Sequence, residues 1–314
     1  MNRLILTVVI LMWSTLSVAA INVVATTSSM GMLTRTVGGE FVKVTELALP
    51  DRDIHTLQVR PSMLQALRQA QLVVAIGAEL EQGWLPPAIE GSANAKILPN
   101  TLGYFEAAAQ VPLIDAQGNA NRSEGDVHPL GNPHVQLDPV RMADIAQALA
   151  ERLAKLDATH SAIFRANAAA FKTAVNGQLA HWHQLAANNK GVMLYHKDAN
   201  YLLARFNIPL LATVEPLAGI PPTASHILSL VRQFKGKKGV ILHTVYQGNA
   251  GIAQLASQLG WQHIALPLEP ANNSHQQSYL HRHTLKQVTP QKPINAPTTH
   301  RRTPIPSIVK PRNY

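Results

Sequence analysis

The sequence contains no cysteine. This absence excludes a disulfide framework, an iron–sulfur cluster, a thiolate zinc site and a cysteine nucleophile, and it leaves no cysteine near the start for a lipid. Aromatic residues are also scarce, at 5%, whereas 46% of the 314 residues are hydrophobic. A chain of this length and composition is sufficient for two domains with a large buried core, as in α/β proteins.

Acidic residues are absent downstream of Pro270, where seven Lys and Arg residues lie. The net charge of +9 therefore comes mainly from one basic tail, and the rest of the chain is close to neutral. The tail is rich in proline and shows no apolar periodicity. We therefore expect residues 281–314 to be disordered and solvated, and we expect no nucleic-acid partner.

No apolar run after residue 20 is long enough to span a bilayer. The run before it begins with Arg3, continues as apolar residues from Leu4 to Trp13 broken only by Thr7, and ends in the small residues Val18-Ala19-Ala20. This order is typical of a secretory signal peptide, which we assign to residues 1–20. The sequence thus predicts export to the periplasm, as a soluble protein after cleavage.

Short apolar runs alternate with helical patterns in both halves of the chain. Strands are expected at 21–25, 41–48, 72–77 and 95–98, and again at 191–195, 209–214, 239–242 and 264–268. Strands that alternate with helices imply parallel sheets. Between the two groups, residues 139–187 have helical spacing and predict one long helix, or two joined near Asp157. We therefore expect an N-terminal lobe (21–138), a linking helix (139–187) and a C-terminal lobe (188–280).

Three of the 14 histidines stand out by their context. His55 lies in a loop after the second expected strand, and His196 directly follows the strand at 191–195. His134 lies in a loop restricted by two prolines, immediately before the long helix. Ligands of open α/β sheets bind at the carboxyl ends of strands, and imidazoles that converge on one point suit zinc.

The segments around these histidines resemble a known family. Pro50-Asp51-Arg52-Asp53-Ile54-His55-Thr56 and Gly131-Asn132-Pro133-His134-Val135-Gln136-Leu137-Asp138-Pro139 are similar to the two N-lobe motifs of the cluster A-I substrate-binding proteins. His196-Lys197-Asp198-Ala199 resembles the third ligand motif of that family. Two departures are visible: Gln136 stands where the family usually has Trp, and a basic, proline-rich tail replaces its final helix.

The resemblance implies the metal-binding component of an ABC importer, of the zinc type. Its fold would be two parallel-sheet α/β lobes linked by one rigid helix, in the form of a clamp. The protein would be no enzyme; it would capture Zn²⁺ between the lobes as a monomer and deliver the ion to a membrane permease. His55, His134 and His196 would be ligands, because zinc members use three histidines, whereas manganese members use two histidines and two carboxylates.

The sequence offers several candidates for the fourth ligand. Glu269 ends the last expected strand, the position most like the family's carboxylate, and is the favoured candidate. Glu215, a water molecule and His243 are the alternatives. Asp138 and Asp198 are near enough in sequence to orient the histidine rings, with helix capping as the alternative for Asp138. The stretch 115–130, which holds His128, reads as a surface loop.

Other functions are compatible with parts of this pattern. A manganese- or iron-binding component of the same importer class is one, and an adhesin-like surface protein is another. A zinc hydrolase is the third, because three histidines and a water also form catalytic sites, but the sequence has no His-Glu-x-x-His helix.

Overall fold

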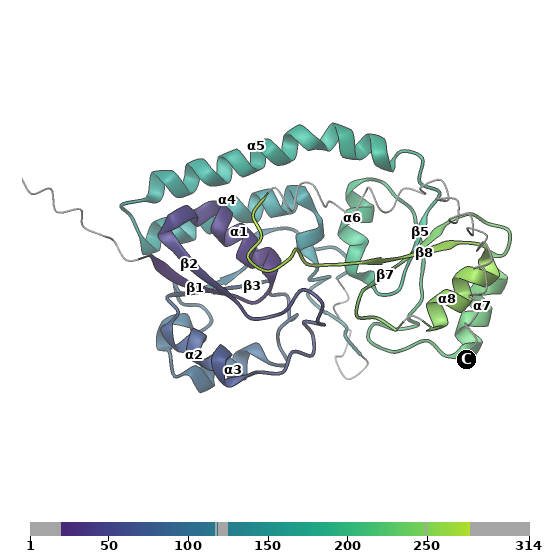
Figure 1. Cartoon of the computed structure of the whole chain (residues 1–314), viewed down its shortest axis with the longest axis horizontal. Helices are drawn as coiled ribbons and strands as arrows, with labels where there is room; N and C mark the ends of the chain where they lie inside the picture. The colour runs from purple at the N-terminus through teal and green to yellow at the C-terminus, as the bar shows by residue number, and fades with distance from the viewer. Residues whose placement is uncertain (1–19, 117, 119–124, 249, 277–314) are drawn as a thin grey trace, which may run out of the picture.

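The computed structural model describes residues 20–116, 118, 125–248 and 250–276. The assigned signal peptide, except for Ala20, and the basic tail lie outside the described residues. Two α/β lobes lie next to each other, and the long helix α5 runs along both of them (Figure 1). None of the helices in the described part of the chain is long and apolar enough to cross a bilayer.

The N-terminal lobe contains a four-stranded parallel sheet in the order β2-β1-β3-β4. Its strands are β1 (Ile21–Ala25), β2 (Val42–Glu46), β3 (Leu72–Ala75) and β4 (Tyr104–Glu106), and its helices are α1 (Ser28–Gly38), α2 (Pro61–Gln69) and α3 (Leu85–Ser92). The strand expected at 95–98 was wrong. Asn94 accepts a hydrogen bond from the backbone N–H of Lys96 and starts a short 3₁₀ turn there, so the sheet is completed by Tyr104–Glu106 instead.

The C-terminal lobe repeats this plan, with strand order β6-β5-β7-β8 and parallel pairing throughout. Its strands are β5 (Val192–Leu194), β6 (Leu210–Thr213), β7 (Val240–Thr244) and β8 (Gln262–Leu266). Its helices are α6 (Asn200–Arg205), α7 (Ala224–Phe234) and α8 (Ala250–Leu259). The expectation of two parallel-sheet α/β lobes is confirmed.

Two helices, not one, occupy the segment between the lobes: α4 (Pro139–Leu156) and α5 (Ser161–Ala186). They separate at Asp157, one of the two possibilities that the sequence allowed. Its carboxylate accepts hydrogen bonds from the backbone N–H groups of Thr159 and His160, at 3.1 and 3.3 Å, and so stabilises the turn. Helix α5 has 26 residues, about 39 Å at 1.5 Å per residue, which lets it reach both lobes.

The two central strands of the C-terminal lobe, β5 and β7, bury both of their faces. Val192 and Leu194 of β5 belong to the large hydrophobic cluster that includes the N-terminal lobe and α5, whereas Met193 points to a second cluster with Ile241 of β7. Alternation of this kind between two apolar clusters is expected of a parallel sheet covered on both sides. It fixes the sheet against α5 and therefore fixes where the strand ends lie.

The carboxyl ends of the two sheets carry the loops that matter for function. The loop after β2 bears His55, and the chain directly after β5 bears His196. In each lobe the first strand lies between the second and the third, so the strand order reverses there. Crevices at such points bind ligands in open α/β sheets.

Candidate metal centre

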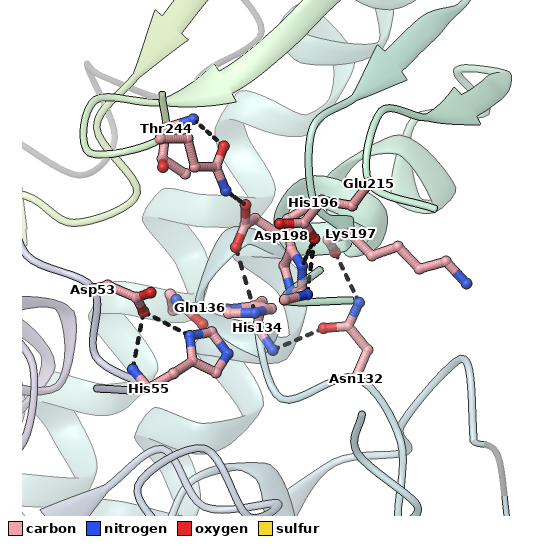
Figure 2. A network of polar contacts seen from close by, with 12 residues as sticks. Asp53, His55, Asn132, His134, Gln136, His196, Lys197, Asp198, Glu215 and Thr244 are labelled. Carbon is pink, nitrogen blue, oxygen red and sulfur yellow. Dashed lines mark hydrogen bonds and ion pairs between the residues drawn. The ribbon is translucent and has the colours of Figure 1, made fainter. Parts of the chain in front are cut away.

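The structure brings His55, His134 and His196 together, although they lie in three distant segments of the chain. One nitrogen from each ring lies within 4.8 Å of the others. The ring centroids are 5.4 to 5.7 Å apart, and Figure 2 shows the three rings next to one another between the lobes. Ligand atoms of a tetrahedral zinc are roughly 3.3 Å apart, given bonds of about 2.0–2.1 Å, so a small contraction would bind an ion.

Asp53 orients the ring of His55. Its carboxylate contacts Nδ1 of His55 at 2.7 Å and accepts a hydrogen bond from the backbone N–H of the same residue at 3.0 Å. The loop is also held by Trp84, whose indole N–H donates to the carbonyl of Ile54 at 2.8 Å. Nε2 of His55 is buried and has no hydrogen-bond partner among the described residues, which leaves it available as a ligand.

Asn132 positions His134 and also joins the two lobes. Its side-chain oxygen accepts from the backbone N–H of His134 at 3.0 Å, and its amide N–H donates to the carbonyl of Lys197 at 2.8 Å. The hydroxyl of Tyr201 donates to the carbonyl of Asn132 at 2.6 Å. His134 is only 1% exposed, and neither of its ring nitrogens has a hydrogen-bond partner among the described residues.

Glu215 orients the ring of His196. Its Oε2 contacts Nδ1 of His196 at 2.8 Å and also accepts from the backbone N–H of Gly219 at 3.0 Å. Glu215 directly follows β6, the strand next to β5, so the two side chains meet at one sheet edge. Carboxylates that hold the outer nitrogen of a metal-binding imidazole fix the tautomer and the direction of the ring.

The electrostatic setting differs between the rings. Burial lowers the pKa of His134 well below its usual value, and the neighbouring histidines add to this effect. Burial also acts to lower the pKa of His196, but the carboxylates of Asp198, Glu215 and Asp126 outweigh it and raise this pKa to about 9. The neutral ring of His134 is therefore ready to bind a metal directly.

The structure does not bring Glu269 to the three histidines. Its carboxylate accepts from the backbone N–H of Ser29 at 2.7 Å and from the amide of Gln136 at 3.3 Å. It thus occupies the first turn of α1, where free N–H groups and the helix dipole attract a carboxylate. This geometry gives no support to Glu269 as the fourth ligand; instead it joins the C-terminal lobe to the N-terminal lobe.

Three other residues were considered from the sequence, either as the fourth ligand or as residues that orient the histidine rings. Asp138 is the N-cap of α4 and accepts from both the Nε and the Nη2 of Arg205, so it is a structural anchor. His243 contacts His263 and its own strand's backbone, not the three rings. Glu215 is the carboxylate described above. Asp53 was missed, although an Asp two residues before a histidine is a known turn pattern.

A cavity of about 230 Å³ adjoins the histidines. His128, His134 and His196 line it, together with the carboxylates of Asp115, Asp126 and Glu215 and the single cation of Lys197. The ring centroid of His128 lies 5.6 Å from that of His55. An excess of carboxylates around a cavity raises the local concentration of cations, so this space suits an approaching metal ion.

Two parallel-sheet lobes that carry imidazoles from both sides to one point define the class of metal-binding substrate-binding proteins. Residues 23–287 match the family described as ZnuA, zinc-uptake complex component A periplasmic, and the chain belongs to this family. Members are substrate-binding proteins of ABC transporters and are not enzymes.

Individual relatives are distant. The chain is 26% identical over 48% of its length to the metal ABC transporter substrate-binding lipoprotein ScbA of Streptococcus cristatus, and this match spans only 46% of that protein. It is 23% identical to the manganese ABC transporter substrate-binding lipoprotein scaA of Streptococcus gordonii, over 71% of each chain. The crystal structure of ZnuA superposes with a TM-score of 0.73 and 19% identity, over 86% of this chain and 98% of that one.

Proposed function

We propose that this protein captures Zn²⁺ outside the cytoplasm and delivers it to the membrane permease of an ABC importer. The observation that supports zinc is the set of three buried imidazoles, two of which have ring nitrogens with no hydrogen-bond partner among the described residues. Three imidazoles in a compact site favour zinc, whereas manganese prefers a larger share of oxygen ligands.

His55, His134 and His196 would bind the ion directly. The ion would reach them through the acidic cavity and lose its waters there. Asp53 and Glu215 would hold the outer nitrogens of two of the rings, so that Nε2 of His55 and of His196 face the metal. The N-terminal lobe contributes two ligands and the C-terminal lobe one, so an ion bound here joins the lobes in a way that a permease can detect.

Manganese is the alternative cargo, because a relative named for manganese matches 71% of the chain. The periplasm is the proposed location, in keeping with the family description, and a monomer with a permease as its partner is the proposed working form. Three imidazole ligands favour zinc over manganese, because manganese prefers a larger share of oxygen ligands.

The test is a measurement of metal content and of zinc affinity by competition with a chelator, on the protein and on its His55→Ala, His134→Ala and His196→Ala variants. We expect one tightly held zinc and a loss of affinity of at least about 100-fold in each variant, more than outer residues typically cost. His181→Ala, which removes an exposed histidine of α5, is the matched control. Equal binding in all variants, or tighter binding of Mn²⁺ than of Zn²⁺, would contradict the proposal.

A further inference from the structure

We propose that Asp198 is the fourth ligand of the metal, through its Oδ1 atom. This inference rests on the proposed function and names a residue of the same site. Asp198 follows His196 by two residues in the short 3₁₀ turn Lys197–Ala199, at the carboxyl end of β5. Figure 2 shows its carboxylate directed toward the ring of His134.

The carboxylate of Asp198 is buried and only half satisfied. The residue is 5% exposed, and Oδ1 has no hydrogen-bond partner among the described residues. A carboxylate oxygen without a donor inside a protein is strongly disfavoured unless a cation compensates it. Because no donor in the described part of the chain reaches Oδ1, a divalent ion bound beside it would supply a positive partner for this oxygen.

The position of Oδ1 fits a ligand of the same ion. It lies 3.5 Å from Nε2 of His134, close to the roughly 3.3 Å that separates two ligands of a tetrahedral zinc. No residue that the structure describes forms a hydrogen bond with that nitrogen. Asp198 lies outside the set of three rings whose ligand atoms are within 4.8 Å of one another, so the contact with His134 is the one that would bring Oδ1 to the ion, and binding would draw this oxygen toward the other two rings.

The other oxygen of Asp198 is held by a chain of hydrogen bonds. Oδ2 accepts from the side-chain amide of Gln247 at 3.2 Å, and the Oε1 of Gln247 accepts from the backbone N–H of Thr244 at 2.8 Å. Thr244 is the last residue of β7, so the carboxylate is fixed to the sheet. Metal-binding carboxylates are normally hydrogen-bonded in this way, which directs the free oxygen to the ion.

Charge and symmetry support the same assignment. The carboxylates of Asp53 and Glu215 contact the outer nitrogens of two rings, whereas Asp198 faces the inner side of the site. Its negative charge would offset half of the charge of Zn²⁺ in a buried place. Each lobe would then supply two ligands. Those of the C-terminal lobe, His196 and Asp198, would come from one short segment after β5.

The experiment compares the zinc affinity of Asp198→Asn with that of the unsubstituted protein, of Glu269→Gln and of His128→Gln. Asp144→Asn is the matched control, because it removes an aspartate that pairs with Lys172 far from the rings. We expect a loss of more than about 100-fold in Asp198→Asn, beyond the effect of a residue that only supports a ligand. The losses in the Glu269 and His128 variants should be smaller.

Two additional measurements separate a ligand from a structural residue. Asp198→Asn keeps an acceptor for Gln247 and the shape of the side chain, so the metal-free variant should melt no lower than the unsubstituted protein. The visible bands of its Co²⁺ complex should be shifted from those of the unsubstituted protein, because a water molecule or the neutral amide would replace the carboxylate. An affinity within threefold of the unsubstituted protein, a larger loss in either other variant, or a lower melting temperature of the metal-free form would overturn the assignment.

The outcomes also distinguish this inference from the function on which it rests. If the unsubstituted protein binds no zinc, both are overturned. If binding depends on the three histidines and is indifferent to Asp198, only the fourth ligand is overturned, and His128 or Glu269 takes its place according to which variant loses affinity.

Discussion

Glu215 offers the sharpest test of how the site is oriented. A single oxygen, Oε2, contacts both Nδ1 of His196 and the backbone N–H of Gly219. In Glu215→Gln the amide oxygen can replace this atom and keep both contacts, so the variant removes only the charge. In Glu215→Ala both contacts are lost and the ring is free to turn.

The expected magnitudes follow from this difference. Residues that support a metal ligand typically cost about 10–100-fold in metal affinity when they are replaced. We expect Glu215→Gln to weaken zinc binding about 10-fold, or about 1.4 kcal/mol, and Glu215→Ala about 100-fold, or about 2.7 kcal/mol. The measurement is competition for zinc against a chelator of known affinity at constant pH.

The matched control is Glu151→Gln, which removes the charge of an exposed glutamate paired with Arg165 at 2.7 Å. This variant should bind zinc as the unsubstituted protein does, since exposed pairs contribute little. The reasoning about Glu215 is refuted if Glu215→Ala binds zinc as tightly as the unsubstituted protein. It is also refuted if the Gln variant loses more affinity than the Ala variant.

Three other predictions concern stability. Zinc at 1,000 times its dissociation constant should stabilise the protein by about 4 kcal/mol and raise the melting temperature by about 10 °C, and His134→Ala should abolish this rise in a thermal scan. Asp138→Ala removes the N-cap of α4 and the partner of Arg205, so the free energy of unfolding in urea should fall by about 2–3 kcal/mol. Asp138→Asn keeps a capping oxygen and should lose less of this free energy. Gly131→Ala should lower the free energy of unfolding by about 1–3 kcal/mol, because Gly131 has φ of +130° and an added Cβ would lie 2.7 Å from the side chain of Leu113. A urea midpoint equal to that of the unsubstituted protein would contradict this prediction.

Local patterns were sufficient to predict most of the fold. The apolar run 72–77 predicted β3, because the burial of a short apolar run is a local property. The strand expected at 95–98 failed for the opposite reason. The run Ala95–Leu98 is apolar enough for a strand, but a side-chain cap at Asn94 favours a turn.

The site was only partly predictable. Three histidines in distinctive loops were found from their context, and the structure places their rings together. Glu269 was chosen because it follows the last strand, but sequence position does not reveal that the chain there crosses to the first turn of α1. Which carboxylate faces the ion depends on contacts between lobes, and the pairing of Asp198 with Gln247, 49 residues away, has no signature in the sequence.

The bonds between the lobes explain how the site can bind a metal without large movement. Asn132 donates to the carbonyl of Lys197, and Arg205 of α6 holds Asp138 next to the loop of His134. These contacts, together with α5, fix the segments of His134 and His196 before an ion arrives. Little binding energy is then spent on ordering the lobes, and this preorganisation favours tight capture. The backbone N–H of Asp126 donates to the carbonyl of Ala218 at 2.9 Å and adds a further bond between the lobes beside the cavity.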